Sequence, residues 1–164
     1  MTKHRLPTHE PRGASDGFRE ECGVAAVHGN PEAANLVYLA LYALQHRGQE
    51  SAGIAVGDGQ RIRRSVGMGH VADVFSNEER LRELTGRHAI GHCRYGTAGG
   101  SMLENAQPLR MTHRRGPVAL AHNGNLVNAL TLRHELDQEG SIFRTSSDTE
   151  VILHLMARSK QGTV

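Results

Sequence analysis

The distribution of apolar residues along the chain predicts short strands that alternate with helices. An apolar run at 22–29, CGVAAVHG, predicts a buried strand that ends at a Gly-Asn-Pro turn. The next segment, 31–48, is apolar on most sides, which predicts a helix buried between layers, with Pro31 in its first turn and Gly48 at its C-terminal end. Residues 51–67 predict two strands joined at Asp58-Gly59.

The second half of the chain continues this alternation. Residues 70–86 predict one or two short helices, with Ser76 or Asn77 as the N-cap. A strand is predicted from 87 into a glycine-rich loop that reaches 100, and another within 116–128 before a turn. Two helices follow, an amphipathic one at 128–140 and one from about Asp148 to Ala157. Hairpin strands with helices against them predict an α+β fold with largely antiparallel sheets.

Residues 1–20 differ in composition from the rest of the chain. Pro or Gly interrupts this segment four times, and its large apolar residues are Leu6 and Phe18. Such a segment buries too little surface to offset the entropy cost of ordering it. We therefore expect a disordered leader and a folded domain that begins near Cys22.

Composition and charge narrow the class of protein. The 164 residues suit one domain, and with 4% aromatic residues and no Trp its core must be built from Leu, Val, Ile and Ala. A net charge of +2 without a basic block argues against nucleic-acid binding. The longest apolar run, at 36–44, falls far short of the roughly 20 residues of a membrane span. Two cysteines and no apolar signal segment predict a reducing, cytoplasmic location.

Four polar clusters lie at the ends of predicted elements, where loops on a rigid frame often carry chemistry. They are Cys22, HCRYGTAGG, AHNGNL and TSSDTE. Cys22 is either a small buried residue at the start of a strand, as unpaired cysteines commonly are, or a nucleophile. If Cys22 became the N-terminal residue, its α-amine, with a pKa of about 7.7 to 8.0, could act as the base.

The other three clusters also allow a structural and a functional interpretation. Asn123 and Gly124 form either a tight turn or the hydrogen-bond donors of an oxyanion hole. Arg94 is either a surface residue beside a flexible loop or a bidentate partner for a carboxylate. Asp148 is either the cap of the last helix or the partner of a substrate ammonium, and one carboxylate could serve both purposes.

The chain has 11 histidines, which raises the question of a metal site. His88 and His92 lie on one face of a predicted strand and could be two ligands. Cys93, His113 and His122 are further candidates. No CxxC or HExxH spacing accompanies them, so we predict no metal site.

Taken in order, five segments resemble successive motifs of one family. They are ECGVAAVHG, LQHRGQESAGIAV, GHCRYGTAGG, AHNGNLVN and TSSDTEVILHL. These segments are similar to the class II glutamine amidotransferase domain and, among such domains, to that of the amidophosphoribosyltransferases. The alternatives are another class II amidotransferase, such as glucosamine-6-phosphate synthase, or a non-catalytic glutamine-binding domain. Glucosamine-6-phosphate synthases typically have an EYRGYDSAG-like stretch, and a Trp where this chain has Tyr95.

The resemblance runs from Cys22 to about Ala157 and implies a fold and a set of roles. The fold is the N-terminal nucleophile (Ntn) hydrolase fold, a four-layer αββα sandwich, which we expect to be truncated at its C-terminal end within 22–164. The implied catalytic residues are Cys22 as the nucleophile, with Asn123 and Gly124 as the oxyanion hole. Arg94 is implied to bind the glutamine carboxylate and Asp148 its ammonium group; Thr97 lies in the glutamine loop, and Arg47 and Tyr95 order the surrounding loops.

The resemblance also assigns a role to the leader. It implies that residues 1–21 are a propeptide. While Cys22 is linked to Glu21 its nitrogen is an amide, which cannot act as a base. We therefore expect the unprocessed chain to lack glutaminase activity.

The full-length enzyme of this family makes 5-phosphoribosylamine, glutamate and pyrophosphate from phosphoribosyl pyrophosphate (PRPP), glutamine and water, which is the first committed step of de novo purine synthesis. The resemblance implies that this chain lacks the phosphoribosyltransferase domain, which binds PRPP and Mg²⁺. Some members of the family carry a 4Fe–4S cluster on later cysteines. For this chain the resemblance implies glutamine as the partner and no cofactor. For the full-length enzyme it implies a homo-oligomer.

Overall fold

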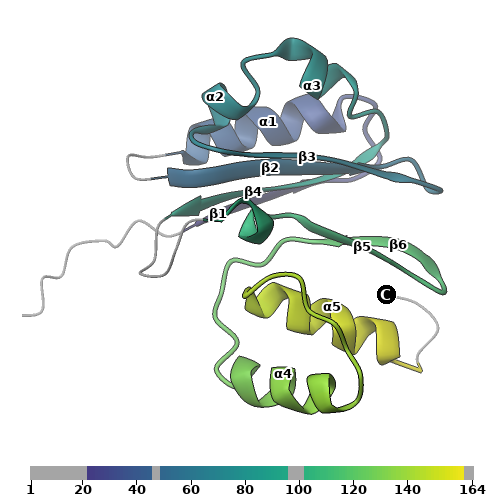
Figure 1. Ribbon diagram of the computed structural model, residues 1–164. Helices are drawn as coiled ribbons and strands as arrows, with labels where there is room; N and C mark the ends of the chain where they lie inside the picture. The colour runs from purple at the N-terminus through teal and green to yellow at the C-terminus, as the bar shows by residue number, and fades with distance from the viewer. Residues whose placement is uncertain (1–21, 46–48, 96–101, 161–164) are drawn as a thin grey trace, which may run out of the picture.

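The computed structural model describes residues 22–45, 49–95 and 102–160, and the elements within them form four layers (Figure 1). The first layer contains the helices α1 (Ala33–Leu44), α2 (Val71–Val74) and α3 (Glu78–Arg82). A four-stranded sheet lies beneath it, followed by a two-stranded sheet and then by α4 (Ala129–Gln138) and α5 (Asp148–Arg158). This order confirms the predicted α+β, αββα sandwich.

The larger sheet contains β1 (Gly23–Val27), β2 (Gln49–Gly57), β3 (Ile62–Met68) and β4 (His88–Tyr95). Its strand order is β1-β4-β2-β3, and all neighbouring strands are antiparallel. Gly23 pairs with Cys93, so the start of β1 lies beside the end of β4. The segment predicted to be buried at 22–29 is an edge strand. Burial alternates along it because Ala25 and Val27 pack against the core on one face, whereas Val24, on the other face, is 46% exposed.

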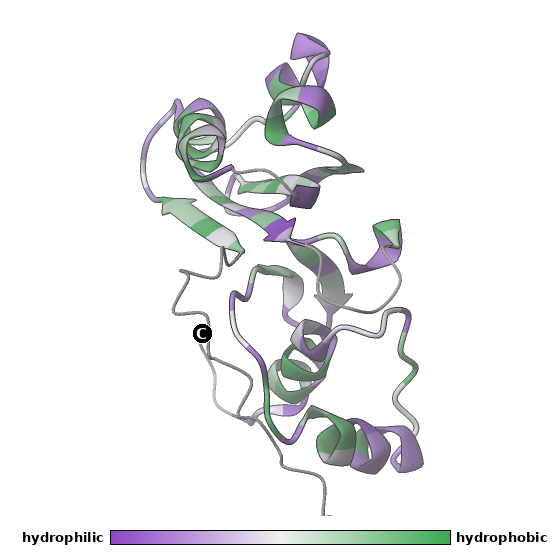
Figure 2. Ribbon diagram, turned by 90° about the vertical axis from the view of Figure 1, so that its left-hand side faces the viewer, coloured by the Kyte–Doolittle hydropathy of each residue, from purple (hydrophilic) through white to green (hydrophobic). Residues whose placement is uncertain are grey.

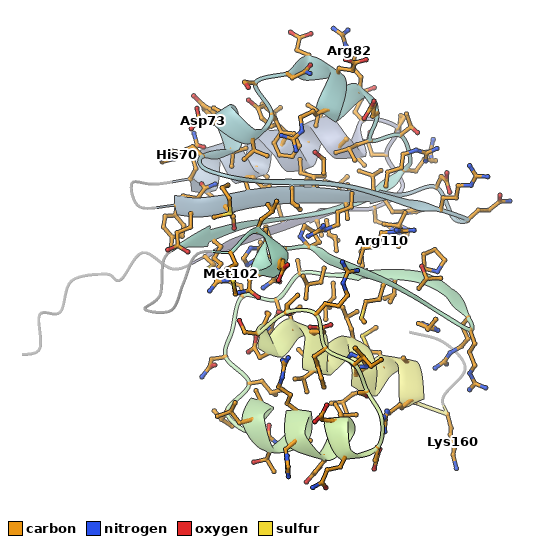
Figure 3. All side chains as sticks on the ribbon, in the orientation of Figure 1. His70, Asp73, Arg82, Met102, Arg110 and Lys160 are labelled. Carbon is orange, nitrogen blue, oxygen red and sulfur yellow. The ribbon has the colours of Figure 1, made fainter. Side chains whose placement is uncertain are left out.

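The smaller sheet pairs β5 (Leu109–His113) with β6 (Gly116–Leu120), and the short 3₁₀ helix η1 (Leu103–Asn105) precedes it. The sequence predicted β6 but not β5. Side chains fill the space between the two sheets and between the hairpin and α5 in Figure 3, where Arg110 of β5 is labelled. The helices on the two outer sides carry both hydrophobic and hydrophilic residues, as amphipathic helices do (Figure 2).

A glycine on β4 allows α1 to pack closely on the sheet. A Cβ atom at Gly91 would lie 2.4 Å from Cγ1 of Val37 and 2.7 Å from Cδ1 of Leu41. Both of these α1 side chains are fully buried in the core that α1 forms with the sheet. Any larger residue at position 91 would therefore push the helix away.

Several element ends differ from the sequence prediction. The first helix ends at Leu44 and not at Gly48, because Gln45 is already extended, with φ −72° and ψ 135°; Gly48 lies outside the described residues. Pro31 lies in a turn before the helix. The β2–β3 connection covers residues 58–61, since Gly57 pairs with Ile62, and the amide of Asp58 donates to the Arg61 carbonyl at 3.2 Å.

Local side-chain hydrogen bonds stabilise the β2–β3 turn and the start of α3. The Asp58 carboxylate accepts hydrogen bonds from the amides of Gln60 at 2.9 Å and Arg61 at 2.7 Å, and these bonds lower the pKa of Asp58. Asn77 is the cap of α3, since its side chain accepts a bond from the Glu79 amide at 2.9 Å. This selects Asn77 from the two predicted N-caps.

Candidate active site

A cavity of about 620 Å³ lies between the start of β1, the end of β4, the segment after β6 and the start of α5. The ends of β4 and β6 and the start of α5 lie toward the left in Figure 1. Six of the predicted site residues line it, and they are Cys22, Arg94, Tyr95, Asn123, Gly124 and Asp148. The other two, Arg47 and Thr97, lie outside the described residues. Four segments that are distant in sequence thus contribute to one site.

Cys22 precedes β1 and is half-buried at the wall of this cavity. Its Sγ accepts a hydrogen bond from the main-chain amide of Tyr95 at 3.3 Å. Tyr95 is itself anchored, because its hydroxyl donates to the Leu44 carbonyl at 3.1 Å. The thiol is therefore held at a fixed place beside the end of β4.

The second cysteine has a different environment. Cys93 is 0% exposed and belongs to the core on the α1 side of the sheet. Burial raises the pKa of the Cys93 thiol, which disfavours the reactive thiolate. A Cβ atom at Gly23 would lie only 2.7 Å from Cys93 Sγ, so the residue after Cys22 has to be small.

The segment after β6 is held by hydrogen bonds at three points. Asn123 donates from Nδ2 to the main-chain oxygen of Cys22. The His122 amide donates to Oε1 of Gln107 at 2.7 Å, and the Leu126 amide donates to Oδ2 of Asp148 at 2.8 Å. A side chain at Gly124 would collide with His122, because a Cβ atom there would lie 2.8 Å from Nε2. The Asn-Gly pair is thus part of a fixed segment that borders the cavity and contacts Cys22.

The two charged candidates, Arg94 and Asp148, come from different layers. Arg94 is on β4, next to Tyr95, and among the described residues it forms no ion pair. Asp148 is the first residue of α5, and its side chain is 19% exposed. Asp148 does not cap the helix, because the side chain of Ser147 accepts the bond from the Thr149 amide at 3.2 Å. The Asp148 carboxylate instead binds the segment after β6 and faces the cavity.

Three residues that shape the site are not among the predicted site residues, although His92 is one of the candidate metal ligands. His92 is 1% exposed and lines the cavity two residues before Arg94. The side chain of Gln107 accepts a hydrogen bond from the His122 amide. Oδ1 of Asn105 accepts one from the Ser146 amide at 3.1 Å, and Nδ2 of Asn105 donates to the Ser146 hydroxyl at 3.0 Å. Gln107 and Asn105 act through contacts distant in sequence, so no local pattern marked them.

The candidate metal ligands do not come together. In the part of the chain that the structure describes, no group of three His, Cys, Asp or Glu side chains could hold a metal ion. His88 is exposed and contacts His28, with 2.8 Å between their Nδ1 atoms, whereas His92 is buried in the cavity wall.

None of the described helices is both long enough and apolar enough to cross a membrane.

Comparison with known proteins identifies relatives along most of the chain. A family model for the glutamine amidotransferase domain matches residues 94–164. Amidophosphoribosyltransferase of Lacticaseibacillus casei is 51% identical over 150 residues, which cover 92% of this chain and 75% of that protein. The chloroplastic amidophosphoribosyltransferase 1 of Arabidopsis thaliana is 57% identical over 143 residues, which cover 87% of this chain and 25% of that protein.

Solved structures give the same result. A structure described as the allosteric regulatory enzyme of purine biosynthesis matches with a TM-score of 0.79 and 50% identity, over 85% of this chain and 30% of that one. The glutamine PRPP amidotransferase from B. subtilis, complexed with ADP and GMP, matches with a TM-score of 0.77 and 48% identity, over the same shares. These neighbours confirm the Ntn hydrolase fold. The chain thus belongs to the amidophosphoribosyltransferase family, whose glutamine amidotransferase domain it carries.

Proposed function

We propose that the cavity binds glutamine and that Cys22 hydrolyses its side-chain amide. The observation that carries this proposal is that one cavity is lined by a thiol, a guanidinium, a carboxylate and a side-chain amide donor, from Cys22, Arg94, Asp148 and Asn123. Glutamine presents the complementary groups, namely a carboxylate, an ammonium and a reactive amide. Arg94 would bind the carboxylate and Asp148 the ammonium, each through a charge-assisted hydrogen bond.

The reaction then follows from the chemistry of these groups. Sγ of Cys22 attacks the amide carbon, and the negative charge that develops on the oxygen is stabilised by Nδ2 of Asn123 and the amide of Gly124. The base takes the thiol proton and passes it to the leaving nitrogen, so that ammonia departs and a γ-glutamyl thioester remains. Water cleaves the thioester, which releases glutamate and restores the thiol.

The base in this proposal is the α-amine of Cys22 itself. An α-amine has a pKa of about 7.7 to 8.0, so a useful fraction is neutral near physiological pH. In the chain that starts at Met1 this nitrogen is an amide. Removal of residues 1–21 would therefore activate the site, which is the proposed role of the leader.

The activity of the whole protein is a further proposal, because the chain spans only 25% of the Arabidopsis relative and 30% of each of the two solved chains. We propose that the ammonia made here is used by a phosphoribosyltransferase domain that acts on PRPP with Mg²⁺, in a homo-oligomer, as in the first committed step of purine synthesis. A 4Fe–4S cluster and the cytoplasmic location stay predictions, and several plant relatives are named as chloroplastic.

The direct test compares two versions of this chain, one that begins at Met1 and one that begins at Cys22. Glutamate and ammonia release are measured for both, and mass spectrometry verifies each N-terminus. We expect activity only when Cys22 is first, and its loss in Cys22→Ser within that shorter version. Full activity in a chain that retains Met1 would contradict the amine-as-base mechanism.

The same preparations test the alternative of a glutamine sensor. Calorimetry would measure glutamine binding to the chain that begins at Cys22 and to its Cys22→Ala variant. Binding without turnover, unchanged by Cys22→Ala, would favour a non-catalytic glutamine-binding domain. Turnover that stops in Cys22→Ala supports the enzyme.

A further inference from the structure

We infer that His92 is a positioning residue for glutamine hydrolysis: it holds the main chain of His122 and so aligns the adjoining Asn123–Gly124 segment with the oxyanion. The inference rests on the proposed function, because it concerns the same cavity. It concerns a residue on β4 that faces this cavity without being one of the groups expected to touch glutamine.

The first observation is a buried polar side chain with no partner. His92 is 1% exposed, and within the described ranges neither Nδ1 nor Nε2 makes a hydrogen bond. Leaving a polar group buried and unpaired costs free energy, and such groups are rare in native proteins. The burial of an imidazole at this place therefore points to a role that a hydrophobic side chain of similar size would not supply.

The second observation is what the ring faces. The main-chain carbonyl of His122 is close enough to favour a ring N–H, while burial acts more strongly in the opposite direction and lowers the pKa of His92 to about 4. The charges of Arg94 and His122 also lower it. The imidazole is thus neutral near pH 7, with one N–H to donate and no charge to compete with Arg94 for the substrate carboxylate.

The third observation is how the segment is held elsewhere. Oε1 of Gln107 accepts a hydrogen bond from the His122 amide at 2.7 Å, and Nδ2 of Asn123 donates one to the main-chain oxygen of Cys22. Gln107 thus binds the N–H of His122, and His92 faces the C=O of the same residue. The two side chains therefore contact the two peptide units on either side of His122. Hydrogen bonds at catalytic sites are often long without substrate and shorten in the complex. We expect the bond from His92 to the His122 carbonyl to form when glutamine binds.

A set of substitutions separates positioning from packing, using the chain that begins at Cys22. His92→Phe keeps the ring and removes both nitrogens; it should lower kcat about tenfold to a hundredfold, as misplacement of catalytic groups does, with KM changed less than about threefold. His92→Asn and His92→Gln place an amide near the position of Nδ1 or Nε2, respectively. One of them should restore most of the lost kcat and so identify the donating nitrogen.

His88→Phe is the matched control, because His88 lies on the same face of the same strand but outside the cavity. It should leave kcat and KM unchanged. Circular dichroism and a thermal melt verify that each variant is folded, and His92→Asn and His92→Gln are compared if His92→Phe does not fold. Wild-type kcat in His92→Phe, or an equal kcat loss in folded Asn and Gln variants, would overturn the inference.

Nuclear magnetic resonance gives a readout that does not depend on activity. The amide signals of Asn123 and Gly124 should move in His92→Phe and stay in place in His88→Phe, and the wild-type ring should remain neutral well below the ordinary histidine midpoint of 6.5. Unmoved amide signals together with an ordinary midpoint would overturn the role of His92. A wild-type chain with no glutaminase activity would instead overturn the proposed function, and the amide signals would still decide whether His92 holds the segment.

Discussion

The side chain of Asn123 donates a hydrogen bond to the main-chain oxygen of Cys22, a residue 101 positions earlier in the chain. This bond connects the segment after β6 to the start of β1, and so it connects the two sheets at the cavity. A side-chain amide has two N–H donors. One of them holds Cys22, and the other remains for the oxyanion that forms when Cys22 attacks an amide.

Asn123→Ala tests this relationship. Loss of one oxyanion donor typically lowers kcat by about 10² to 10³, and we expect a loss of that size here with little change in KM for glutamine. Asn128→Ala is the matched control, since Asn128 is exposed and its side chain makes no capping bond at α4. Steady-state glutaminase assays measure both variants. Equal kcat values for Asn123→Ala and Asn128→Ala would show that Asn123 is not a donor of the oxyanion hole.

Asp148 combines a charge with a structural bond, and two substitutions separate these roles. Asp148→Asn keeps an oxygen for the Leu126 amide but removes the charge, so we expect KM for glutamine to rise about tenfold to a hundredfold, the value of a hydrogen bond to a charged group. Asp148→Ala also removes the bond to Leu126 and should lower thermal stability as well. An unchanged KM in Asp148→Asn would show that the glutamine ammonium binds elsewhere.

Gly53 acts on the site through Gln107. A Cβ atom at Gly53 would lie 2.3 Å from the Gln107 carbonyl oxygen and 2.4 Å from Cγ1 of Val66. Gly53→Ala should therefore destabilise the fold by about 1 to 3 kcal/mol, as overpacking does, and should lower kcat by displacing Gln107 from His122. Urea unfolding and glutaminase assays measure the two effects.

Gly57→Ala provides the matched control for that substitution. Gly57 is on the same strand, but a Cβ atom there would have no neighbour closer than 3.9 Å. We expect near-wild-type kcat and a much smaller loss of stability. If both alanine variants were equally destabilised, the loss would come from the strand backbone and not from the contact with Gln107.

The buried His92 predicts a pH dependence of stability. Its pKa is about 4 in the folded protein and 6.5 as the ordinary value. Between these values the unfolded chain binds a proton that the folded chain does not, so stability falls as the pH falls through this window, by about 1.4 kcal/mol per pH unit from this group. Above pH 6.5 the contribution is constant.

The measurement is the free energy of unfolding, obtained from urea titrations across this range of pH. His92→Gln lacks the titrating group, so its stability should decline less steeply with acid than that of the wild type. The other histidines are common to both proteins and cancel in the comparison. Two parallel stability curves would show that His92 titrates normally in the folded state.

Regular elements with strong local signals were predictable from the sequence. The Asp58-Gly59 turn signal predicted β2 and β3, and the Asn77 cap and the amphipathic pattern predicted α3 and α4. β5 was missed because LRMTH mixes basic and polar residues with apolar ones and lacks the β-branched pattern that favours strands. Its pairing with β6 gives it its conformation.

The site was predictable only in part, because local sequence does not show which residues meet in space. The resemblance supplied Cys22, Arg94 and Asp148 together, and the structure places all three around one cavity. Ser147 displaced Asp148 as the helix cap, since Asp148 is engaged by the Leu126 amide from another segment. Roles that depend on such distant contacts follow from packing and not from spacing.

Covalent labelling tests the central claim most directly. A diazo-ketone analogue of glutamine is incubated with the chain that begins at Cys22, with and without excess glutamine, and the adduct is mapped by mass spectrometry. We predict one adduct, on Cys22, which glutamine suppresses and which the chain that begins at Met1 forms far more slowly. An adduct on Cys93, or labelling of Cys22 that glutamine does not suppress, would contradict the assignment of Cys22 as the nucleophile of a glutamine site.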